Sequence, residues 1–314
     1  MRRAIELAAS VRATTSPNPW VGCVLSTGHE GATQPPGGLH AEAVALAAAR
    51  ERARGATLWV TLEPCAHHGR TPPCADAIAA AGVRRVVVGV EDPDPRVRGR
   101  GIAALRAAGI DVVVGVCEDE VRAQLAPYLK HRRTGRPWVV LKLAATLDGR
   151  TAAPDGSSKW ITGEASRADA HRLRAESDAV LVGAGTVRAD DPSLTVRGAE
   201  GRDPLRVVLG RAPEGAKVHP ALEVEGDLGA VLDDLGSRGV VQLLVEGGAA
   251  VAHAFHSAGL VDRYVVYLAP ALFGGDDARG LFAGPGAPTV DDVWRGRIVA
   301  VERVGDDLRV EVEL

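Results

Sequence analysis

A histidine, two cysteines and a glutamate near the start of the chain constrain it more than any other feature. His40-Ala-Glu42 is followed by Pro64-Cys65 and then by Cys74. One imidazole and two thiolates are the ligands of a catalytic zinc ion that keeps its fourth coordination position open for water. Zinc lowers the pKa of that water to about 7, and a nearby glutamate can carry a proton to a leaving amine. These residues therefore predict a zinc-dependent hydrolytic deaminase.

The spacing of the four residues predicts a site at the start of two helices. A glycine loop leads into an Ala-rich helix whose first turn holds His40 and Glu42. A second helix is expected to begin at Cys74, where the helix dipole favours a thiolate. We expect Cys65 in the loop that follows a strand over residues 57–62. Eight residues separate the cysteines, whereas the familiar deaminase signature has two between them.

Two other interpretations of these residues are open from sequence alone. The histidine could be a surface residue and the cysteines buried thiols, because lone cysteines usually pack as small hydrophobic side chains. A structural zinc site is the second alternative, and it would need a fourth protein ligand such as His67 or His68. A structural site would leave Glu42 without a role, so the pattern favours a catalytic one.

Length and charge limit the number of domains and the kind of partner. A chain of 314 residues is expected to form two domains of about 150 residues each. Hydrophobic residues make up 46% and charged residues 25%, as in soluble globular proteins. With 37 basic and 40 acidic residues, the net charge of −3 gives no field that would attract nucleic acid. We therefore expect a small-molecule substrate.

The cysteines and the apolar runs predict a cytoplasmic protein. Cys23 and Cys117 lie in strand-like apolar runs, so we expect them to be buried rather than disulfide-bonded, as in a reducing compartment. The N-terminal residues lack the apolar core and cleavage site of a signal peptide. No stretch approaches the roughly 20 apolar residues of a membrane span, so no membrane contact is expected.

Strand-like and helix-like runs alternate along the whole chain, which predicts layered α/β domains. The turn at residues 134–137 separates an expected domain 1–136 from a second domain 137–314. The expected strands are 21–25, 57–62, 86–90, 112–116, 138–145, 179–182, 205–209, 241–245, 262–268, 298–304 and 308–312. The expected helices are 40–53, 73–81, 99–108, 118–132, 164–176 and 228–236.

Motifs in both halves resemble one family. The first half carries Pro17-Asn18-Pro19-x-Val21-Gly22, Leu39-His40-Ala41-Glu42 and the long string from Thr61 to Cys74. The second half carries Lys142-Leu143-Ala144-x-x-Leu147-Asp148-Gly149, Trp160-Ile161-Thr162-Gly163, Leu173-Arg174, Gly185-Thr186-Val187, the segment from Ala189 to Arg197, and Val245-Glu246-Gly247-Gly248. Over nearly its whole length the chain resembles the RibD family of riboflavin biosynthesis, which joins a pyrimidine deaminase to an NADPH-dependent reductase. The resemblance implies an α/β protein with an N-terminal cytidine-deaminase-like three-layer domain and a C-terminal dihydrofolate-reductase-like domain.

The resemblance also implies a first reaction and its residues. Zinc would be bound by His40, Cys65 and Cys74, Glu42 would shuttle protons, and Asn18 would touch the pyrimidine. The reaction would be hydrolytic deamination of 2,5-diamino-6-(5-phosphoribosylamino)pyrimidin-4(3H)-one. Ammonia would be released.

The implied second reaction uses NADPH to reduce the ribosyl group to ribityl, with hydride added to the sugar carbon of a ring-opened imine. Lys142 and Glu246 would lie at the reacting centre. The implied cofactor contacts are Ala144, Trp160, Thr186, Asp190, and the phosphate-cradling run Gly248, Ala249, Ala250, Val251, Ala252, His253 and Ala254. The implied substrate contacts are Ser158, Arg174, Leu194, Arg197 and Glu246. A homo-oligomer is expected for this family.

The residues of the second half support these roles less directly than those of the first. Arg174 and Arg197 could hold a phosphate through bidentate hydrogen bonds, or could be solvated surface groups. Gly247 and Gly248, after a strand and before a helix, fit an anion site at a helix N-terminus. Lys142 lies in an apolar run, so it needs a partner or ligand unless it sits on an edge strand and points into water.

One region departs from the family pattern. The segment between Arg206 and Leu243 is shorter than expected, which predicts the loss of a strand and of part of the surface for the cofactor's adenosine. Because of this shortening, one alternative stays open: a deaminase whose second domain has lost its reductase activity. Two further alternatives are a nucleic-acid-editing zinc deaminase and a non-catalytic scaffold stabilised by zinc.

Overall fold

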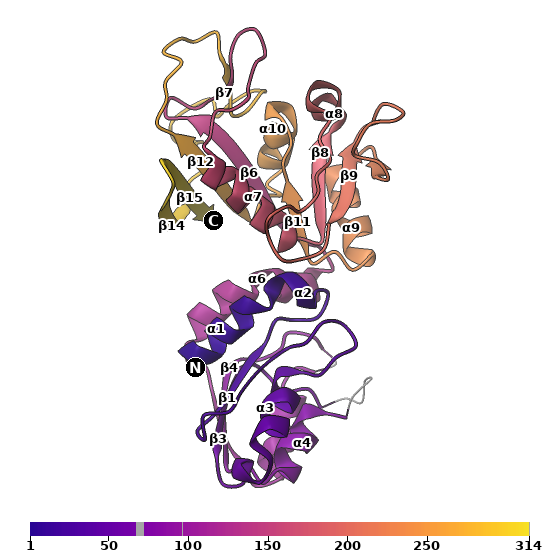
Figure 1. The fold of residues 1–314 in the computed structure, drawn as a ribbon, viewed down its shortest axis with the longest axis vertical. Helices are drawn as coiled ribbons and strands as arrows, with labels where there is room; N and C mark the ends of the chain where they lie inside the picture. Colours follow the sequence, from indigo (N-terminus) through magenta and orange to yellow (C-terminus); the bar gives the residue numbers. More distant parts are fainter. Residues whose placement is uncertain (67–71, 96, 314) are drawn as a thin grey trace. The chain divides into compact units, whose positions relative to one another are not determined.

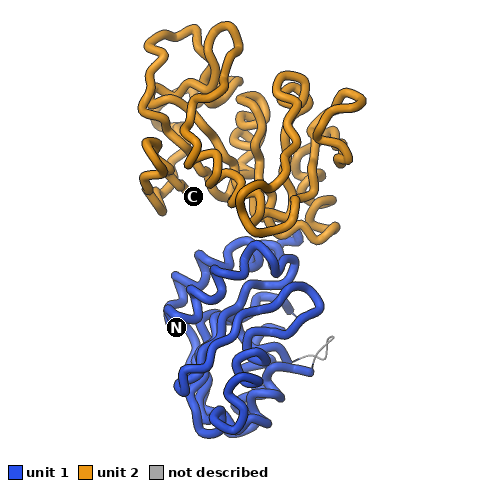
Figure 2. Tube along the Cα trace, viewed as in Figure 1, with its two compact units in different colours: residues 1–135 blue, residues 136–314 orange. Residues whose placement is uncertain are grey.

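The chain folds as two compact units, Met1–Gly135 and Arg136–Leu314, which Figure 2 shows in different colours. The structure is a computed structural model that describes residues 1–66, 72–95 and 97–313. Each unit contains its own main sheet. Within the described ranges, no helix combines the length and the apolar character needed to cross a membrane.

The first unit, the indigo-to-magenta part of the chain in Figure 1, is built on a five-stranded sheet in the order β2-β1-β3-β4-β5. Strand β1 is antiparallel to β2 and β3, whereas β3, β4 and β5 run parallel. Its strands are β1 (Gly22–Leu25), β2 (Glu30–Ala32), β3 (Thr57–Leu62), β4 (Arg85–Val90) and β5 (Asp111–Val114). Its helices are α1 (Arg2–Ser10), α2 (Arg12–Thr15), α3 (Ala41–Ala49), α4 (Cys74–Ala80), α5 (Arg100–Ala107) and α6 (Glu118–Thr134), with a 3-10 turn at Arg50–Ala53.

Two glycines show that helices cover both faces of this sheet. A Cβ on Gly22 of β1 would lie 1.9 Å from the carbonyl oxygen of Ala4 in α1. A Cβ on Gly31 of β2 would lie 2.2 Å from the carbonyl oxygen of Ala41 in α3. Gly31 pairs with Cys23, the neighbour of Gly22, and neighbouring strand residues point to opposite faces. The sheet is therefore the middle of three layers, as the family resemblance implied.

The expected elements of this unit are present within a few residues of their predicted ends. Strand β2 and helix α2 were not expected, because three or four residues give almost no periodic signal. The helix expected over residues 40–53 ends at Ala49 and continues as a 3-10 turn. Cys23 is buried in β1, but the expectation for Cys117 is wrong. It is half-buried at the start of α6 with φ of 56°, outside any strand.

The second unit is built on an eight-stranded sheet in the order β10-β9-β8-β11-β6-β12-β15-β14. The six strands from β10 to β12 run parallel, and β15 and β14 complete the sheet antiparallel. The strands are β6 (Trp138–Thr146), β7 (Arg150–Ala152), β8 (Ala179–Gly183), β9 (Leu205–Leu209), β10 (Leu222–Val224), β11 (Gln242–Val245), β12 (Arg263–Ala269), β13 (Arg279–Gly280), β14 (Arg297–Val304) and β15 (Asp307–Glu313). The helices are α7 (Glu164–Ala175), α8 (Ala184–Asp190), α9 (Leu228–Ser237) and α10 (Ala249–Ser257).

Alternate residues of β6 supply two separate apolar cores. Leu141 packs on one face with residues of α9 and α10, whereas Val140 packs on the other with residues of α7 and α8. Lys142 is two residues beyond Val140, so its side chain shares the α7 face. Strand β6 pairs with β11 and β12 on its two sides. The alternative that Lys142 lies on an edge strand is therefore wrong.

The shortened segment between Arg206 and Leu243 still contributes a strand. Leu222–Val224 forms β10 and pairs in parallel with residues 207–209 of β9. The expectation that a strand is missing here is wrong, because three residues suffice to extend the sheet edge. Strands β7, β10 and β13 and helix α8 were not expected, and all four are short.

Candidate active sites

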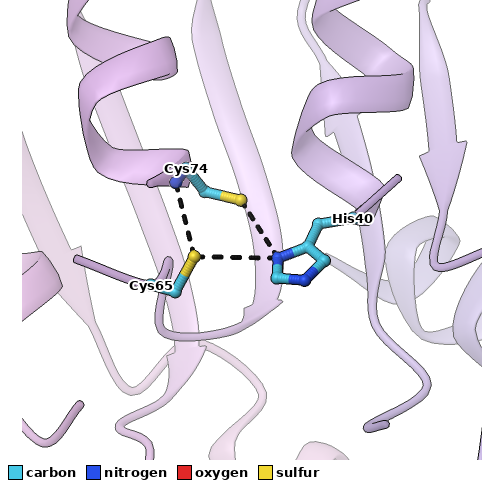
Figure 3. Close-up of side chains that lie close together, drawn as sticks. All are labelled: His40, Cys65 and Cys74. Carbon is cyan, nitrogen blue, oxygen red and sulfur yellow. Dashed lines mark hydrogen bonds between the residues drawn. The ribbon is translucent and has the colours of Figure 1, made fainter. Parts of the chain in front are cut away.

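His40, Cys65 and Cys74 converge in the first unit (Figure 3). The imidazole Nδ1 of His40 lies 3.3 Å from Sγ of Cys74 and 3.7 Å from Sγ of Cys65. All three potential ligand atoms lie within 4.8 Å of one another. Tetrahedral zinc with bonds of about 2.0–2.3 Å separates its ligand atoms by roughly 3.5 Å. The cluster therefore fits a zinc ion in both chemistry and spacing.

Three secondary-structure ends bring these ligands together. His40 is the residue before α3, Cys74 is the first residue of α4, and Cys65 follows the end of β3. The backbone N–H of Cys74 donates a hydrogen bond to Sγ of Cys65 at 3.4 Å. Both ends of the Cys65–Cys74 segment are thus fixed by elements that the sequence predicted. His67 and His68, the alternative fourth ligands, lie outside the described residues.

The surroundings of Cys65 favour its thiolate form. The hydrogen bond from the Cys74 thiol lowers the pKa of Cys65 to about 4, and the His40 ring acts in the same direction. The same contact raises the pKa of Cys74. The pKa of His40 is raised, first by its contact with Cys65. Negative charge at this position is what a metal cation requires.

Glu42 lies beside the ligands and is almost completely buried. Its exposed fraction is 4%, and this burial raises its pKa to about 7. Glu42, Asn18, His40 and Cys65 line the same cavity of about 180 Å³. A carboxyl group with a pKa near 7 can both take up and release a proton at neutral pH. The geometry thus brings together a proton carrier, the metal ligands and the predicted pyrimidine contact.

Several charged and aromatic residues of this cavity were not predicted. They are Glu63, Asp92, Asp94, Tyr128 and Arg132. The hydroxyl of Tyr128 donates a hydrogen bond to Asp92 at 3.0 Å, and the guanidinium of Arg132 lies 5.1 Å from the centre of the Tyr128 ring. Their positions follow from α6 packing near β4, which no local pattern reveals.

Glu63 organises the loop that forms one wall of this cavity. Its carboxylate accepts backbone hydrogen bonds from Asp92, Gly99, Gly101 and Ile102 at 2.9–3.2 Å. Four donors satisfy an otherwise costly buried charge. Since Glu63 stands two residues before Cys65, the same side chain also fixes the segment that carries a metal ligand.

The second unit contains a larger cavity of about 760 Å³, and most of the predicted reductase residues line it. The lining residues among them are Lys142, Ala144, Ser158, Trp160, Thr186, Asp190, Glu246, Gly248, Ala249, Ala250 and Val251. Ala252, by contrast, is completely buried in the core under α10. His253 packs against the backbone of Gly284. The described lining does not include Ala254, Arg174, Leu194 or Arg197.

Lys142 and Glu246 carry opposite charges in the lining of this cavity, and Arg174, outside the described lining, binds Glu246. Arg174 donates from Nε to Oε1 of Glu246 at 2.5 Å and from Nη2 to Oε2 at 2.9 Å. Burial lowers the pKa of Lys142, and Arg174 keeps the pKa of Glu246 low despite its burial. The ammonium of Lys142 lies 5.8 Å from the centre of the Tyr267 ring. The alternative that Arg174 is a solvated surface group is wrong, since its side chain is only 14% exposed.

The segment after Asp191 holds two further predicted substrate residues. Leu194 is 3% exposed and packs in the α7-side core, in the left-handed conformation with φ of 53°. The carbonyl oxygen of Thr195 accepts a hydrogen bond from Arg174 at 3.2 Å and contacts Nδ1 of His171 at 3.0 Å. Arg197 is exposed. The structure thus brings Arg174 and Glu246 together but leaves the Leu194 side chain inside the core.

The cofactor residues gather where α8 and α10 begin. The backbone N–H of Gly248 donates to Oγ1 of Thr186 at 3.2 Å. A Cβ on Gly247 would lie 2.5 Å from the side chain of Val251, so α10 begins too close to β11 for any larger residue. Asp190 pairs with Lys159 at 3.2 Å, and Trp160 is 69% exposed beneath the guanidinium of Arg167.

Comparison with known proteins identifies both units. Residues 1–90 match the cytidine and deoxycytidylate deaminase zinc-binding region, and residues 137–310 match the RibD C-terminal domain. The riboflavin biosynthesis protein RibD of Escherichia coli is 41% identical, over 98% of this chain and 96% of the relative. The chain belongs to the RibD family. The alignment extends over 355 positions, more than the 314 residues of this RibD chain, so the relative contains segments that this chain lacks.

Two solved structures support the same assignment. Acinetobacter baumannii RibD (form 1) is 40% identical with a TM-score of 0.93, covering 99% of this chain and 97% of that one. A Thermotoga maritima protein titled diaminohydroxyphosphoribosylaminopyrimidine deaminase/5-amino-6-(5-phosphoribosylamino)uracil reductase is 36% identical, with a TM-score of 0.88 over 100% of this chain and 97% of that one.

The protein is therefore a bifunctional deaminase and reductase of riboflavin biosynthesis, with zinc and NADPH as cofactors. The predicted fold, with a deaminase-like and a dihydrofolate-reductase-like unit, is confirmed. Membership of the RibD family replaces two of the alternatives, which were nucleic-acid editing and a non-catalytic scaffold.

Proposed function

We propose that the first unit deaminates 2,5-diamino-6-(5-phosphoribosylamino)pyrimidin-4(3H)-one, with His40, Cys65 and Cys74 as zinc ligands. The observation that carries this proposal is the presence of three ligand atoms within 4.8 Å of one another and a buried glutamate in the same cavity. Three protein ligands leave one tetrahedral position for water. A purely structural site would have no use for Glu42.

Glu42 carries the protons of this reaction. When bound, zinc acts as a Lewis acid that makes water reactive near neutral pH. Glu42 takes a proton from the attacking water and delivers it to the amine that leaves as ammonia. Its burial fits this exchange, because burial raises its pKa to about 7. Asn18, on the same cavity wall, orients the pyrimidine by hydrogen bonding.

The second unit reduces the deaminated product. When bound, NADPH would supply the hydride that reduces the sugar carbon of the ring-opened imine, and the imine nitrogen would take a proton. Lys142 donates that proton, because burial lowers its pKa and its ammonium lines the cavity. Glu246 holds Lys142 in place by charge and contacts the substrate, and Arg174 keeps Glu246 ionised.

The remaining predicted residues position the cofactor and the substrate. We assign cofactor contacts to Ala144, Trp160, Thr186, Asp190 and the start of α10, and substrate contacts to Ser158, Leu194 and Arg197. The N-terminus of α10 offers free backbone N–H groups to a phosphate. Leu194 would act through its backbone, because its side chain is in the core.

Two wider proposals accompany these roles. Residues 1–136 and 137–314 are the deaminase and reductase domains. The protein is a homo-oligomer, supported by β14, an edge strand of eight residues whose Ile298 and Val301 are 61% and 58% exposed. Sedimentation at several concentrations tests the oligomer. A cytoplasmic location stays a prediction.

A two-step assay tests the proposed function. Zinc-loaded enzyme is given the diamino substrate while ammonia release and NADPH oxidation are followed separately. We expect ammonia first, and NADPH oxidation whenever the deaminated intermediate is supplied. Ammonia release without NADPH oxidation by a folded sample would reject the reductase assignment. An RNA mobility shift with deamination of RNA would support nucleic-acid editing instead.

A further inference from the structure

Residues 273–283 form one wall of the reductase cavity, and nothing in the proposed mechanism uses them. Arg279, Leu281 and Ala283 line the cavity, and the backbone N–H of Ala283 donates a hydrogen bond to the carbonyl oxygen of Ala249 at the start of α10 at 3.0 Å. Only two residues of the segment are in a strand, β13, which pairs with β7. A wall with so little regular structure needs other contacts to hold its shape.

Asp148, in the turn between β6 and β7, and Arg150, the first residue of β7, hold this wall in place. The carboxylate of Asp148 accepts backbone hydrogen bonds from Phe273 at 3.0 Å and Gly274 at 2.9 Å. Thr146 orients it, donating from Oγ1 to Oδ1 at 2.5 Å. These hydrogen bonds lower the pKa of Asp148, so the carboxylate stays ionised.

Arg150 acts on the other side of the same loop. Its guanidinium donates to the carbonyl oxygens of Gly275 at 2.9 Å and Ala278 at 3.0 Å. Ala278 immediately precedes Arg279. The two side chains together bind four backbone groups across residues 273–278. They therefore fix the backbone position from which the Arg279 side chain extends.

Arg279 differs from the other cations of the cavity in having no partner. Lys159 pairs with Asp190, Arg167 lies over Trp160, and Lys142 is buried near Glu246. Within the described ranges, the Arg279 guanidinium makes no ion pair or side-chain hydrogen bond, and the residue is exposed at the cavity. An arginine fixed at its backbone and unpaired at its tip is suited to a doubly charged oxyanion.

We propose that Arg279 binds a phosphate group in the reductase cavity, and that Asp148 and Arg150 are positioning residues that present it. The proposal rests on the proposed function, since that function brings phosphates to this cavity. The phosphate belongs to NADPH or to the phosphorylated substrate. NADPH offers its 2′-phosphate and its pyrophosphate, and NADH offers only the pyrophosphate.

The test compares Arg279→Gln with Arg279→Lys, and with Arg297→Gln as a matched control. Arg297 is an exposed arginine of the same unit that is not among the described cavity-lining residues. The dissociation constants of NADPH and NADH are measured by cofactor fluorescence on the full-length protein, and the KM of the deaminated substrate is measured in parallel. We expect Arg279→Gln to weaken the binding of one phosphate-bearing ligand about 10-fold or more. Arg279→Lys should restore part of that binding, and Arg297→Gln should leave the binding of all three ligands unchanged.

The pattern of loss identifies the phosphate. Weaker binding of NADPH with unchanged binding of NADH points to the 2′-phosphate. Weaker binding of both cofactors points to the pyrophosphate. A raised substrate KM alone points to the substrate phosphate. Unchanged values for all three ligands would overturn the proposal while leaving the reductase function intact. A wild-type protein that binds no NADPH would instead reject the proposed function itself.

Asp148→Asn tests the positioning role. We expect it to weaken the binding of the same ligand as Arg279→Gln does. The kcat at saturating ligand should change less than about twofold, because the carboxylate does not touch the reacting atoms. Adding Asp148→Asn to Arg279→Gln should cause little further loss, since both changes remove one interaction. Additive losses, or a fall in kcat alone, would contradict the positioning role. Ammonia release by the first unit should stay unchanged in every variant.

Discussion

At the scale of single residues, burial sets the proton chemistry of the deaminase. Glu42 is 4% exposed and its pKa is raised to about 7, whereas Glu63, also 4% exposed, accepts four backbone hydrogen bonds. Two buried carboxyl groups of one cavity therefore have different surroundings. Those of Glu42 support the proposed proton exchange, whereas Glu63 holds a loop.

Glu42→Gln keeps the shape of the side chain but removes its ability to carry a proton. We expect kcat for ammonia release to fall by about 10²- to 10⁴-fold. Zinc content, measured by atomic emission, and NADPH oxidation with the deaminated intermediate should be those of the wild type. Loss of zinc together with loss of activity would argue instead that Glu42 is structural.

Glu246→Gln leaves Arg174 largely buried without its carboxylate partner. Their side chains are 9% and 14% exposed, so solvent cannot replace the lost hydrogen bonds. Removing one partner of a buried ion pair costs about 3–5 kcal/mol. Urea unfolding followed by fluorescence should show this loss in the transition of the second unit. The double variant Glu246→Gln with Arg174→Met should recover part of it, and no recovery would contradict this explanation.

The same ion pair makes the stability of the second unit depend on pH. Arg174 holds the pKa of Glu246 below its value in the unfolded chain, which is about 4.3. The stability from this pair is therefore fully present above pH 4.3 and is lost as the pH falls through the lowered folded value. Unfolding free energies measured from pH 6 downwards should fall less steeply in Glu246→Gln than in the wild type. Equal slopes would rule out a contribution from this pair.

At the scale of elements, the first turn of α5 packs closely against the segment that follows β3 and carries Cys65. Gly101 lies where a Cβ would be 1.8 Å from the carbonyl oxygen of Pro64, the residue before Cys65. Its backbone N–H also binds Glu63 at 2.9 Å. The position therefore tolerates no side chain unless the segment that carries Cys65 moves.

Gly101→Ala should displace Cys65 and weaken zinc binding. We expect a loss of about 1–3 kcal/mol in the unfolding free energy of the first unit, as for other overpacked sites. Zinc retention during dialysis against a chelator reports the effect on the site. Gly286→Ala is the control, because a Cβ there meets nothing within 4 Å. Equal zinc retention in both variants would show that the start of α5 can move without disturbing Cys65.

At the scale of the whole molecule, the two chemistries are held in separate units. The zinc cluster and its cavity belong to residues 1–135, and the larger cavity belongs to residues 136–314. No described lining residue is shared between the two cavities. We therefore expect that each activity can be abolished without loss of the other.

Removal of zinc with a chelator should abolish ammonia release and leave NADPH oxidation with the deaminated intermediate unchanged. Only the first unit carries the His–Cys–Cys cluster among the described residues, so the second unit has no metal to lose. Adding zinc back should restore ammonia release. A parallel fall in both activities would show that the units depend on each other for folding.

The sequence by itself predicted the His–Cys–Cys cluster, the elements that carry it and the family. This was feasible because His40, Cys65 and Cys74 lie at ends of elements that local patterns predict, and because long motifs identify RibD. Only the tertiary structure decided that Arg174 binds Glu246, that Leu194 lies in the core and that Lys142 is on a central strand. Arg174 and Glu246 are 72 residues apart in the chain. Such contacts depend on the order of strands in the sheet, which pairs segments without regard to their distance along the chain.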